Sequence, residues 1–497
     1  MIEKQRKGGP TFLRRAGGLL IKYNVTALFL VLCAGCFLAS SRTLPSLLDE
    51  LFTRIGRNTF LVLSLLIPVA AGLGLNFGIV IGAMSAQIAI FIVVLFGGGG
   101  LSGLLMCVLL CTPLSVLFGW LVGKLFNSMK GTEMIGGLVA GYFSDGLYQL
   151  LFLYILGGVI PVNNRTLMIS TGVGVKNVIN LEKNLKYALD NISLQAILTA
   201  AFWAALAAAV LLAAARIVRK QPLPMKKALF ILAPLGAAYG LSFIPAANAF
   251  LSAPRQSLLN VVLFGAAGAA LYQAAQLIRA KLAGAKPWLS YKRLVIFAFA
   301  AAAYALTYTG AARVALSAVR LPVLTYLVIA GLYLLIPWFM NTKLGQDMRT
   351  VGHDRSVALS SGINVDRVRI IAMILSTVLA SYGQLISLQN IGTVATYGSH
   401  MQVGLYAIAA LLVGGATVQY ATANQAVLGI VLFHTLFILS TDAGKNLLGN
   451  AQIGEYFRVF MAYGVIALAL AMDAWGKSQS ARRASEGSGA PASPDEA

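Results

Sequence analysis

The stretch NTKLGQDMRTVGHDRSVALSSGINVDRVR, residues 341–369, decides how the rest of the chain is interpreted. It carries five basic and three acidic residues, and apolar runs long enough to cross a bilayer flank it on both sides. Leu344, Met348 and Val351 recur at helical spacing between the charges, which predicts one or two short amphipathic helices. Gly362 should end the last of them, and Asp366 should cap the helix that follows. The stretch is therefore expected to be a structured, water-facing loop of a membrane protein.

The overall composition is that of an integral membrane protein. Of the 497 residues, 58% are apolar and only 11% are charged, and the mean hydropathy is +0.80. The net charge of +22 would suggest nucleic-acid binding in a soluble protein, but here the basic residues gather in particular loops and at both termini. Lysine and arginine prefer the cytoplasmic side of a membrane, so topology explains this charge. The same rule predicts that residues 341–369 and both termini are cytoplasmic.

We predict an all-α fold, a polytopic transmembrane helical bundle. At about 20 residues per crossing, the apolar runs accommodate about fourteen spans, four of them in the motif-poor stretch 193–310. Residues 42–58 are expected to be a short polar connection outside the membrane. The expected parts, in order, are a cytoplasmic basic arm (1–24), an N-terminal transmembrane core (25–192) with an outside segment (161–192), a motif-poor transmembrane block (193–310), a C-terminal transmembrane core (311–476) containing loop 341–369, and a disordered tail (477–497).

Two apolar runs are interrupted at positions where the chain would lie inside the membrane. The run 59–96 is broken around Gly72 to Gly78, and the run 396–440 is broken around 414–425. Broken helices often line a substrate route, because their freed backbone groups need protein or water beside them. An ionisable residue inside a span is likewise a functional candidate, although a hydrogen bond within the bundle is the structural alternative. The residues expected along a substrate path are Asn76, Tyr142, Asp145, Gln149 and Gln384.

The sequence contains no enzyme signature. His353, His400 and His434 are scattered, and no Ser-His-Asp or metal-ligand spacing accompanies them. The four cysteines lie inside apolar runs, which predicts buried thiols and no metal site. The pattern G-x-x-x-x-G-K-[ST] is missing, so the chain is not expected to carry its own ATPase.

Residues 352–365 resemble a known motif. Gly352-His353-Asp354, Val357-Ala358 and Ser361-Gly362-Ile363-Asn364-Val365 are similar to the pattern G-x-N-x-x-A-A-x-x-S-G-I-N-V. That pattern belongs to bacterial ABC-importer permeases that serve branched-chain amino acids, monosaccharides such as ribose, and nucleosides. In that family this cytoplasmic loop is the coupling helix that docks into the ATPase subunit. Permeases of that family are typically shorter than this chain, so the resemblance implies about ten core spans and an inserted transmembrane block of four spans at 193–310. Two positions depart from the pattern, since Asp354 replaces Asn and Val357 replaces Ala, so the resemblance does not identify which ATPase fits.

The resemblance implies a transport function in the bacterial plasma (inner) membrane. The chain would be the permease subunit of an importer and would form the path of a small polar solute, such as a nucleoside, sugar, amino acid or vitamin. ATP would be used by a separate ATPase subunit, and this chain would bind no cofactor. The other implied partners are a second permease subunit, the same or paralogous, and an extracytoplasmic substrate-binding protein. The residues implied in ATPase coupling are Gly352, Asp354, Arg355, Ala358, Ser361, Gly362 and Ile363.

A secondary transporter driven by an ion gradient is the alternative function. It would require intramembrane charges in two inverted halves. Asp145 is the clearest such charge, and no matching acid is found in the second half. A membrane scaffold would explain the motif-poor block 193–310 but would leave the pattern at 352–365 without a reason.

Overall fold

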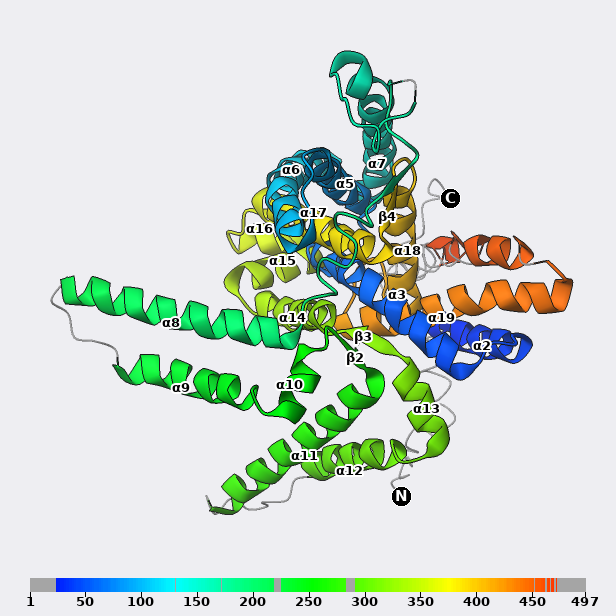
Figure 1. Ribbon diagram of the computed structural model, residues 1–497. Helices are drawn as coiled ribbons and strands as arrows, with labels where there is room; N and C mark the ends of the chain where they lie inside the picture. The colour runs from blue at the N-terminus through cyan, green and yellow to red at the C-terminus, as the bar shows by residue number, and fades with distance from the viewer. Residues whose placement is uncertain are drawn as a thin grey trace, which may run out of the picture. The chain divides into compact units, whose positions relative to one another are not determined.

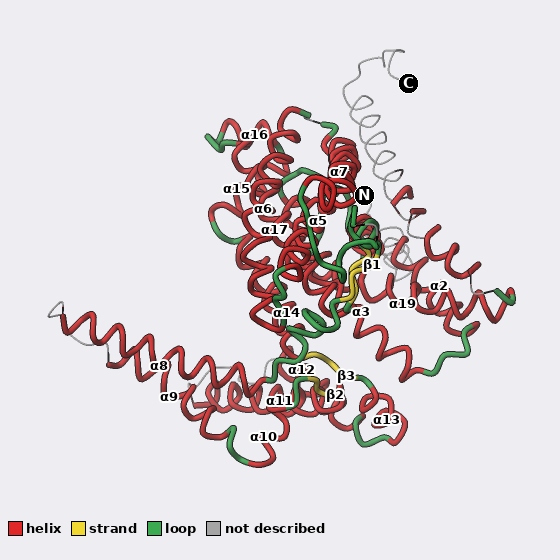
Figure 2. Tube along the Cα trace, turned by 45° about the horizontal axis from the view of Figure 1, so that its top comes forward, coloured by secondary structure: helices red, strands yellow, loops and turns green. Residues whose placement is uncertain are grey.

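The computed structural model describes residues 24–129, 131–170, 172–218, 225–282, 291–450, 452–460, 463–464, 466–468 and 471. Helices dominate this part of the chain, and the strands form two short pairs (Figure 2). Within the described residues, seven helices are long and apolar enough to cross a membrane, or eight if one bent pair is a single span. The fold is thus the predicted polytopic helical bundle. The count of spans stays a prediction, and the arm 1–23 and the tail 477–497 lie outside the described residues.

The chain divides into two compact units. Unit 1 comprises Met1–Arg42, Arg54–Lys186 and Ile329–Ala497, and unit 2 comprises Thr43–Thr53 and Tyr187–Val328. Helices α3 (Leu44–Ser64) and α14 (Val323–Met340) have residues in both. The expected boundaries at 192 and 310 stay predictions. The other elements of unit 1 are α2 (Asn24–Ala39), α4 (Leu66–Ala70), α5 (Ile79–Leu95), α6 (Gly100–Ser128), α7 (Glu133–Leu150), the π-helical turn η1 (Leu151–Val159), β1 (Val178–Asn180), α15 (Lys343–His353), α16 (Arg355–Ser360), α17 (Val365–Ile391), β4 (Thr393–Ala395), α18 (Ser399–Val413) and α19 (Ala423–Leu448).

Unit 2 is a set of helices with one strand pair. Its strands β2 and β3 pair antiparallel with Gln256 opposite Leu321, as β1 and β4 pair in unit 1 with Ile179 opposite Val394. Helices α12 and α13 meet at a bend of 90°. The elements of unit 2 are α8 (Leu194–Val218), α9 (Met225–Leu241), α10 (Pro245–Ser252), β2 (Arg255–Ser257), α11 (Leu258–Leu282), α12 (Tyr291–Leu306), α13 (Gly310–Ala318) and β3 (Arg320–Pro322).

Helix α17 forms the core of unit 1. It packs along α5 and α6 (Figure 1), and glycines bring the backbones close together. A Cβ on Gly82 of α5 would lie 2.6 Å from the carbonyl oxygen of Thr377, and a Cβ on Gly119 of α6 would lie 2.7 Å from the α17 backbone. Membrane helices associate through such small-residue contacts. Because α17 starts at Val365, the core helix of unit 1 begins inside loop 341–369.

Both predicted interruptions are confirmed. Helix α4 is followed by the irregular segment 71–78, and the segment 414–422 separates α18 from α19. A capping box defines the start of α19: the side chain of Thr422 accepts the backbone N–H of Gln425, and the side chain of Gln425 accepts the backbone N–H of Thr422. A Cβ on Gly74 would lie 3.3 Å from the side chain of Val418, so the two irregular segments lie against each other.

Residues 42–58 are not the polar connection that we predicted, because most of them belong to α3. Its apolar face includes the buried Leu47 and Leu51. Its polar face packs within the protein, where the Nε of Arg57 donates to the Oδ1 of Asn390 on α17 at 2.5 Å. The helix is amphipathic, and its polar face lowers the mean hydropathy enough to make the sequence look like a loop.

Candidate functional site

Loop 341–369 is built from two capped helices, as its helical spacing predicted. The side chain of Thr342 accepts a backbone hydrogen bond at the start of α15, and Asp354 accepts two at the start of α16. Met348, Val351 and Ala358 are buried on the inner face. The outer face is mostly polar and charged, with Val357 and Leu359 as exposed apolar side chains, so the loop is an amphipathic layer on unit 1.

The carboxylate of Asp354, which caps α16, is charged at neutral pH. The backbone N–H groups of Val357 and Ser356 donate to its carboxylate and lower its pKa. A lowered pKa adds stability above the ordinary value of about 3.9, and this stability is lost as the pH falls through the folded value. Asparagine, which the resembling family has at this position, is an equally good cap. The departure at Asp354 therefore preserves the local structure of the loop.

The cap of α17 is Asn364 and not Asp366, so our prediction was wrong by two residues. The Oδ1 of Asn364 accepts the backbone N–H of Arg367 at 3.0 Å. Gly362 has a φ of 76°, as expected for the residue that ends α16, and the helix then restarts at Val365. Asp366 lies inside the first turn of α17, where its charge interacts favourably with the helix dipole and with Arg369.

Replacing Asn364 with alanine should therefore destabilise the protein by about 1 kcal/mol, through the loss of one capping hydrogen bond. Asn364→Asp keeps a capping oxygen and should unfold like the wild type. Thermal unfolding of the purified variants in detergent measures both effects. An equal loss of stability in Asn364→Asp and Asn364→Ala would contradict this assignment of the cap.

The end of α15 lies directly against the first irregular segment. A Cβ on Gly352 would lie 2.3 Å from the carbonyl oxygen of Ala70, and a Cβ on Gly72 would lie 2.7 Å from the Cα of Gly352. Gly72 also has a φ of 71°, which side-chain-bearing residues rarely adopt. The two backbones touch with no side chain between them, so α15 is in direct contact with the broken helix.

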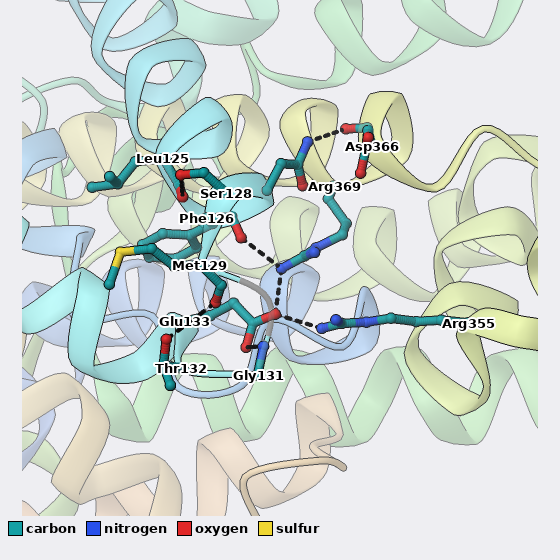
Figure 3. Close-up of polar contacts among 11 residues, drawn as sticks. Leu125, Phe126, Ser128, Met129, Gly131, Thr132, Glu133, Arg355, Asp366 and Arg369 are labelled. Carbon is teal, nitrogen blue, oxygen red and sulfur yellow. Dashed lines mark hydrogen bonds and ion pairs between the residues drawn. The ribbon is translucent and has the colours of Figure 1, made fainter.

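A second connection joins the loop to α7. The Nη2 atoms of Arg355 and Arg369 each lie 2.5 Å from the same oxygen, Oε1 of Glu133 (Figure 3). The other oxygen of Glu133 accepts the backbone N–H of Gly131 at 3.0 Å, and Arg369 also donates to the carbonyl oxygen of Phe126 at 3.2 Å. One carboxylate therefore ties α16 and α17 to the start of α7.

The electrostatics of this cluster are those of a buried ion pair with an extra positive charge. The Arg369 side chain is 0% exposed and that of Glu133 is 9% exposed, whereas Arg355 is 35% exposed. Nε and Nη1 of Arg369 have no hydrogen-bond partner among the described residues. A buried guanidinium depends strongly on its carboxylate, because an unpaired buried charge is costly. Glu133 is therefore the residue on which the cluster depends.

The predicted coupling residues have two kinds of structural role. Gly352 and Arg355 connect the loop to the body of unit 1, as described above. The others shape the loop itself: Asp354 caps α16, Ala358 accepts the backbone N–H of Ile363, Ser361 donates to Val357, and Gly362 ends α16.

Sequence reasoning missed the roles of Glu133 and Arg369. Glu133 was not among the predicted site residues, and Arg369 was counted only as one of the charges of loop 341–369. A useful signal was available, since an arginine within the apolar pattern of a span requires a buried partner. The sequence does not identify that partner as Glu133, because 236 residues separate Glu133 from Arg369.

Asp145 and Gln149 lie together in a second polar cluster. The Oδ1 of Asp145 lies 2.7 Å from Nε2 of His400, and Oδ2 accepts the amide of Gln149 at 2.9 Å. Gln87 of α5 completes the cluster through Nδ1 of His400 at 3.1 Å and the hydroxyl of Tyr148 at 2.9 Å. We had regarded His400 as isolated, and that was wrong, because it joins α18 to α5 and α7.

The remaining path candidates lie apart from this cluster. Asn76 is buried and holds the first irregular segment, donating to Ser376 at 3.2 Å and accepting from the N–H of Gly78 at 2.9 Å. Tyr142 is 60% exposed and lines a pocket of about 450 Å³ together with Tyr406 and other residues. Gln384 is buried, and neither of its amide atoms has a hydrogen-bond partner in the described part of the chain. Among the five candidates, hydrogen bonding thus joins Asp145 and Gln149.

Comparison with known proteins places this architecture in a family. The sequence profile of a family described as "Branched-chain amino acid transport system / permease component" matches residues 134–470. The ribose import permease protein RbsC of Escherichia coli (strain K12) is 31% identical over 148 residues, which cover 29% of this chain and 44% of RbsC. The D-allose transport system permease protein AlsC of the same strain is 27% identical over 157 residues, 31% of this chain and 45% of AlsC.

A third relative is the xylose transport system permease protein XylH of Haemophilus influenzae, 29% identical over 157 residues, 32% of this chain and 39% of XylH. The chain spans less than half the length of each of these relatives. No solved structure matches it. The family profile nevertheless covers well over half of the chain. The chain therefore belongs to the family of permease components of branched-chain amino acid transport systems.

Proposed function

We propose that this chain is the membrane-spanning permease subunit of an ATP-binding-cassette importer that takes up a small polar solute. Family membership supports a transport component, and the three relatives are named for ribose, D-allose and xylose. A sugar-type solute is therefore the first choice over a nucleoside, an amino acid or a vitamin. The observation that carries the proposal is the mechanical connection of loop 341–369 to the body of unit 1.

Coupling would work through the two connections of the loop. An ATPase dimer that closes on ATP would push on α15 and α16. Through Gly352 the push would reach the irregular segment at Gly72, and through Arg355 it would reach Glu133 at the start of α7. Because the two contacts reach different elements of unit 1, one movement of the loop would change the packing of both elements. Such a change would alternate the access of a path between the two sides of the membrane.

The tip of the loop supplies a docking surface for the ATPase. Val357 and Leu359 on α16 are 52% and 63% exposed, although the loop is rich in charge. Exposed apolar side chains on a polar surface are typical of contact sites with a partner protein. The Val357 that departs from the family motif therefore lies on the proposed contact surface.

The other parts of the importer are separate chains. ATP would bind to and be hydrolysed by the ATPase subunit, and this chain would hold no cofactor. A second permease, either a copy or a paralogue, would complete the path, and an extracytoplasmic binding protein would deliver the solute. The complex would lie in the bacterial inner membrane with both termini of this chain in the cytoplasm, in accord with the lysine and arginine residues that both terminal segments carry.

One observation favours the alternative of a gradient-driven transporter. Asp145 has a titratable partner, His400, from the second half of the chain, and such pairs occur in proton-coupled carriers. Uptake of radiolabelled D-ribose, D-allose and D-xylose into vesicles that hold the reconstituted complex, with ATP on the side of the ATPase and the solute and binding protein on the other side, separates the two functions. The importer is expected to need ATP and to tolerate a protonophore. Uptake that needs no ATP and stops with a protonophore would replace the importer with the secondary transporter.

A further inference from the structure

A groove in unit 1 lies between loop 341–369 and the two broken helices. Its volume is about 690 Å³, which is within the usual range of ligand sites. It is lined by α14, by α15, by the end of α4 and by residues 419–423, where the second irregular segment meets α19. An occupant of the groove would therefore touch loop 341–369 and both broken helices at the same time.

The charged wall of the groove is positive. Arg349 and His353 line it and lie four positions apart on α15, so their side chains share one face of that helix. Within the described residues Arg349 forms no ion pair, and no carboxylate lines the groove. Asp354 beside His353 is engaged as the cap of α16, although its charge also acts on His353, and Asp347 lies on another face of α15 than Arg349. An anionic group is therefore the ligand that this wall favours.

The wall formed by residues 419–423 adds further hydrogen-bond donors. The side chains of Gln419 and Tyr420 line the groove, and Tyr420 is 64% exposed. Thr422 and Ala423 also line it at the start of α19, where the helix dipole adds partial positive charge. Guanidinium, imidazole, amide and phenol groups all donate hydrogen bonds to phosphate oxygens. This donor set suits a phosphate group.

The α14 wall is apolar and continues onto a surface that the bilayer would cover. Pro337 lines the groove, and Leu334, Pro337 and Trp338 follow the i, i+3, i+4 spacing of one helix face. Leu334 and Trp338 are each 68% exposed, and α14 is long and apolar enough to cross a membrane. Trp338 lies near the end of this span, where tryptophan is typical of the membrane–water interface. The groove thus joins a positive wall to a wall that faces hydrocarbon.

We propose that this groove binds an anionic phospholipid, with its phosphate at Arg349 and His353 and an acyl chain along α14. Basic pockets at the ends of membrane helices bind such headgroups. A soluble phosphate compound would use only the charged wall, whereas a lipid uses both walls and enters from the bilayer. Because the lipid would contact α15 and residues 419–423 together, it would brace loop 341–369 against the broken helices and make coupling more efficient. The lipid site goes beyond the proposed function, and its existence does not depend on it.

Binding is tested on the purified full chain in a neutral detergent. Added phosphatidylglycerol should raise the melting temperature by about 2 °C more than phosphatidylcholine does, because a ligand of the folded state stabilises it. Arg349→Gln should lose this difference. Glycerol 3-phosphate, which is the headgroup without a tail, should give no such rise. An equal rise with glycerol 3-phosphate would assign the groove to a soluble phosphate compound and overturn the lipid site.

The matched control is Arg367→Gln. Arg367 is an exposed arginine of the same loop that does not line the groove, so this variant removes one positive charge, as Arg349→Gln does. It should keep the full rise with phosphatidylglycerol. If both variants lost the rise equally, the lipid would be attracted to the charge of the loop in general, and the proposed site would be overturned.

A labelling experiment locates the lipid. Phosphatidylglycerol with a photoactivatable group in its acyl chain should label residues 336–340 of α14 in the wild type, and Arg349→Gln should lose this label. A label confined to other segments would overturn the site. Loss of the label when the ATPase subunit is bound would assign the groove to the ATPase and overturn the role of the lipid in coupling.

The effect on transport is measured separately with whichever of D-ribose, D-allose and D-xylose is taken up. ATP-driven uptake should be at least about threefold faster in phosphatidylcholine vesicles with about a quarter of phosphatidylglycerol than in phosphatidylcholine alone. Arg349→Gln should abolish this stimulation, and Arg367→Gln should keep it. Lipid binding without stimulation would overturn the role in coupling. A wild-type complex that takes up no solute with ATP in either lipid would overturn the proposed function, whereas the melting and labelling results decide the lipid site by themselves.

Discussion

Glu133→Gln is expected to lower the free energy of unfolding by about 3–5 kcal/mol, the largest effect of any single substitution on stability that we predict. The side chain of Arg369 is 0% exposed, and Oε1 of Glu133 lies 2.5 Å from its Nη2. Glutamine keeps the shape but loses the charge, which leaves a buried guanidinium without a counter-charge. Thermal or denaturant unfolding in detergent measures the loss.

The control for Glu133 is Glu182→Gln. Glu182 forms an ion pair with Lys186 at 2.8 Å on the surface, where its side chain is 62% exposed. Exposed pairs contribute little, so this variant should unfold like the wild type. An equally small effect at Glu133 would show that the cluster does not depend on its carboxylate.

A double variant separates the structural from the functional role of the cluster. Glu133→Leu combined with Arg369→Met replaces the buried pair with apolar side chains, which is commonly neutral or stabilising. Stability should return towards that of the wild type. ATP-driven uptake should not return, because Arg355 would no longer connect α16 to α7. Recovery of both properties would mean that the cluster only holds the fold together.

Gly352→Ala is expected to abolish ATP-driven uptake and to destabilise the protein by about 1–3 kcal/mol. The added Cβ would lie 2.3 Å from the carbonyl oxygen of Ala70, and backbone on both sides prevents a local adjustment. The end of α15 must then move away from Gly72, and the contact through which the loop acts on the broken helix is lost. Uptake into vesicles and the melting temperature measure the two effects.

Gly449→Ala is the matched control for Gly352→Ala. Gly449 follows α19, outside loop 341–369, at a φ of 70°, and nothing lies within 4 Å of the position of its Cβ. Alanine there meets backbone strain of about 1–2 kcal/mol but no clash. It should destabilise the protein to a similar degree while keeping ATP-driven uptake. If both variants lost uptake equally, reduced stability and not the Gly352 contact would be the cause.

The features that sequence could predict are local ones. Apolar residues at helical spacing predict the two helices of loop 341–369. Gly362 predicts the end of α16, and a nearby Asn or Asp predicts the start of α17. The interruptions at 71–78 and 414–422 follow from glycine in long apolar runs. Each signal involves residues within a few positions of one another, so no knowledge of the fold is required.

The features that sequence could not predict join distant parts of the chain. Glu133 meets Arg355 and Arg369 across more than two hundred residues, and Asp145 meets His400 across 255. Nothing in the local pattern says which acid faces which base. Helix α3 was missed for a related reason, because the polar face that makes it look like a loop is covered by partners such as Asn390.

The measurement that tests the central claim most directly is co-purification of a Walker-motif ATPase with the intact chain. The wild type should bring down one such ATPase, and Val357→Asp on the exposed face of α16 should lose it. The matched control is Val178→Asp on β1, since Val178 is 55% exposed against 52% for Val357, and it should keep the ATPase. Retention of the ATPase by Val357→Asp, or a wild type that purifies without an ATPase and still transports without ATP, would contradict the assignment of loop 341–369 as the coupling site.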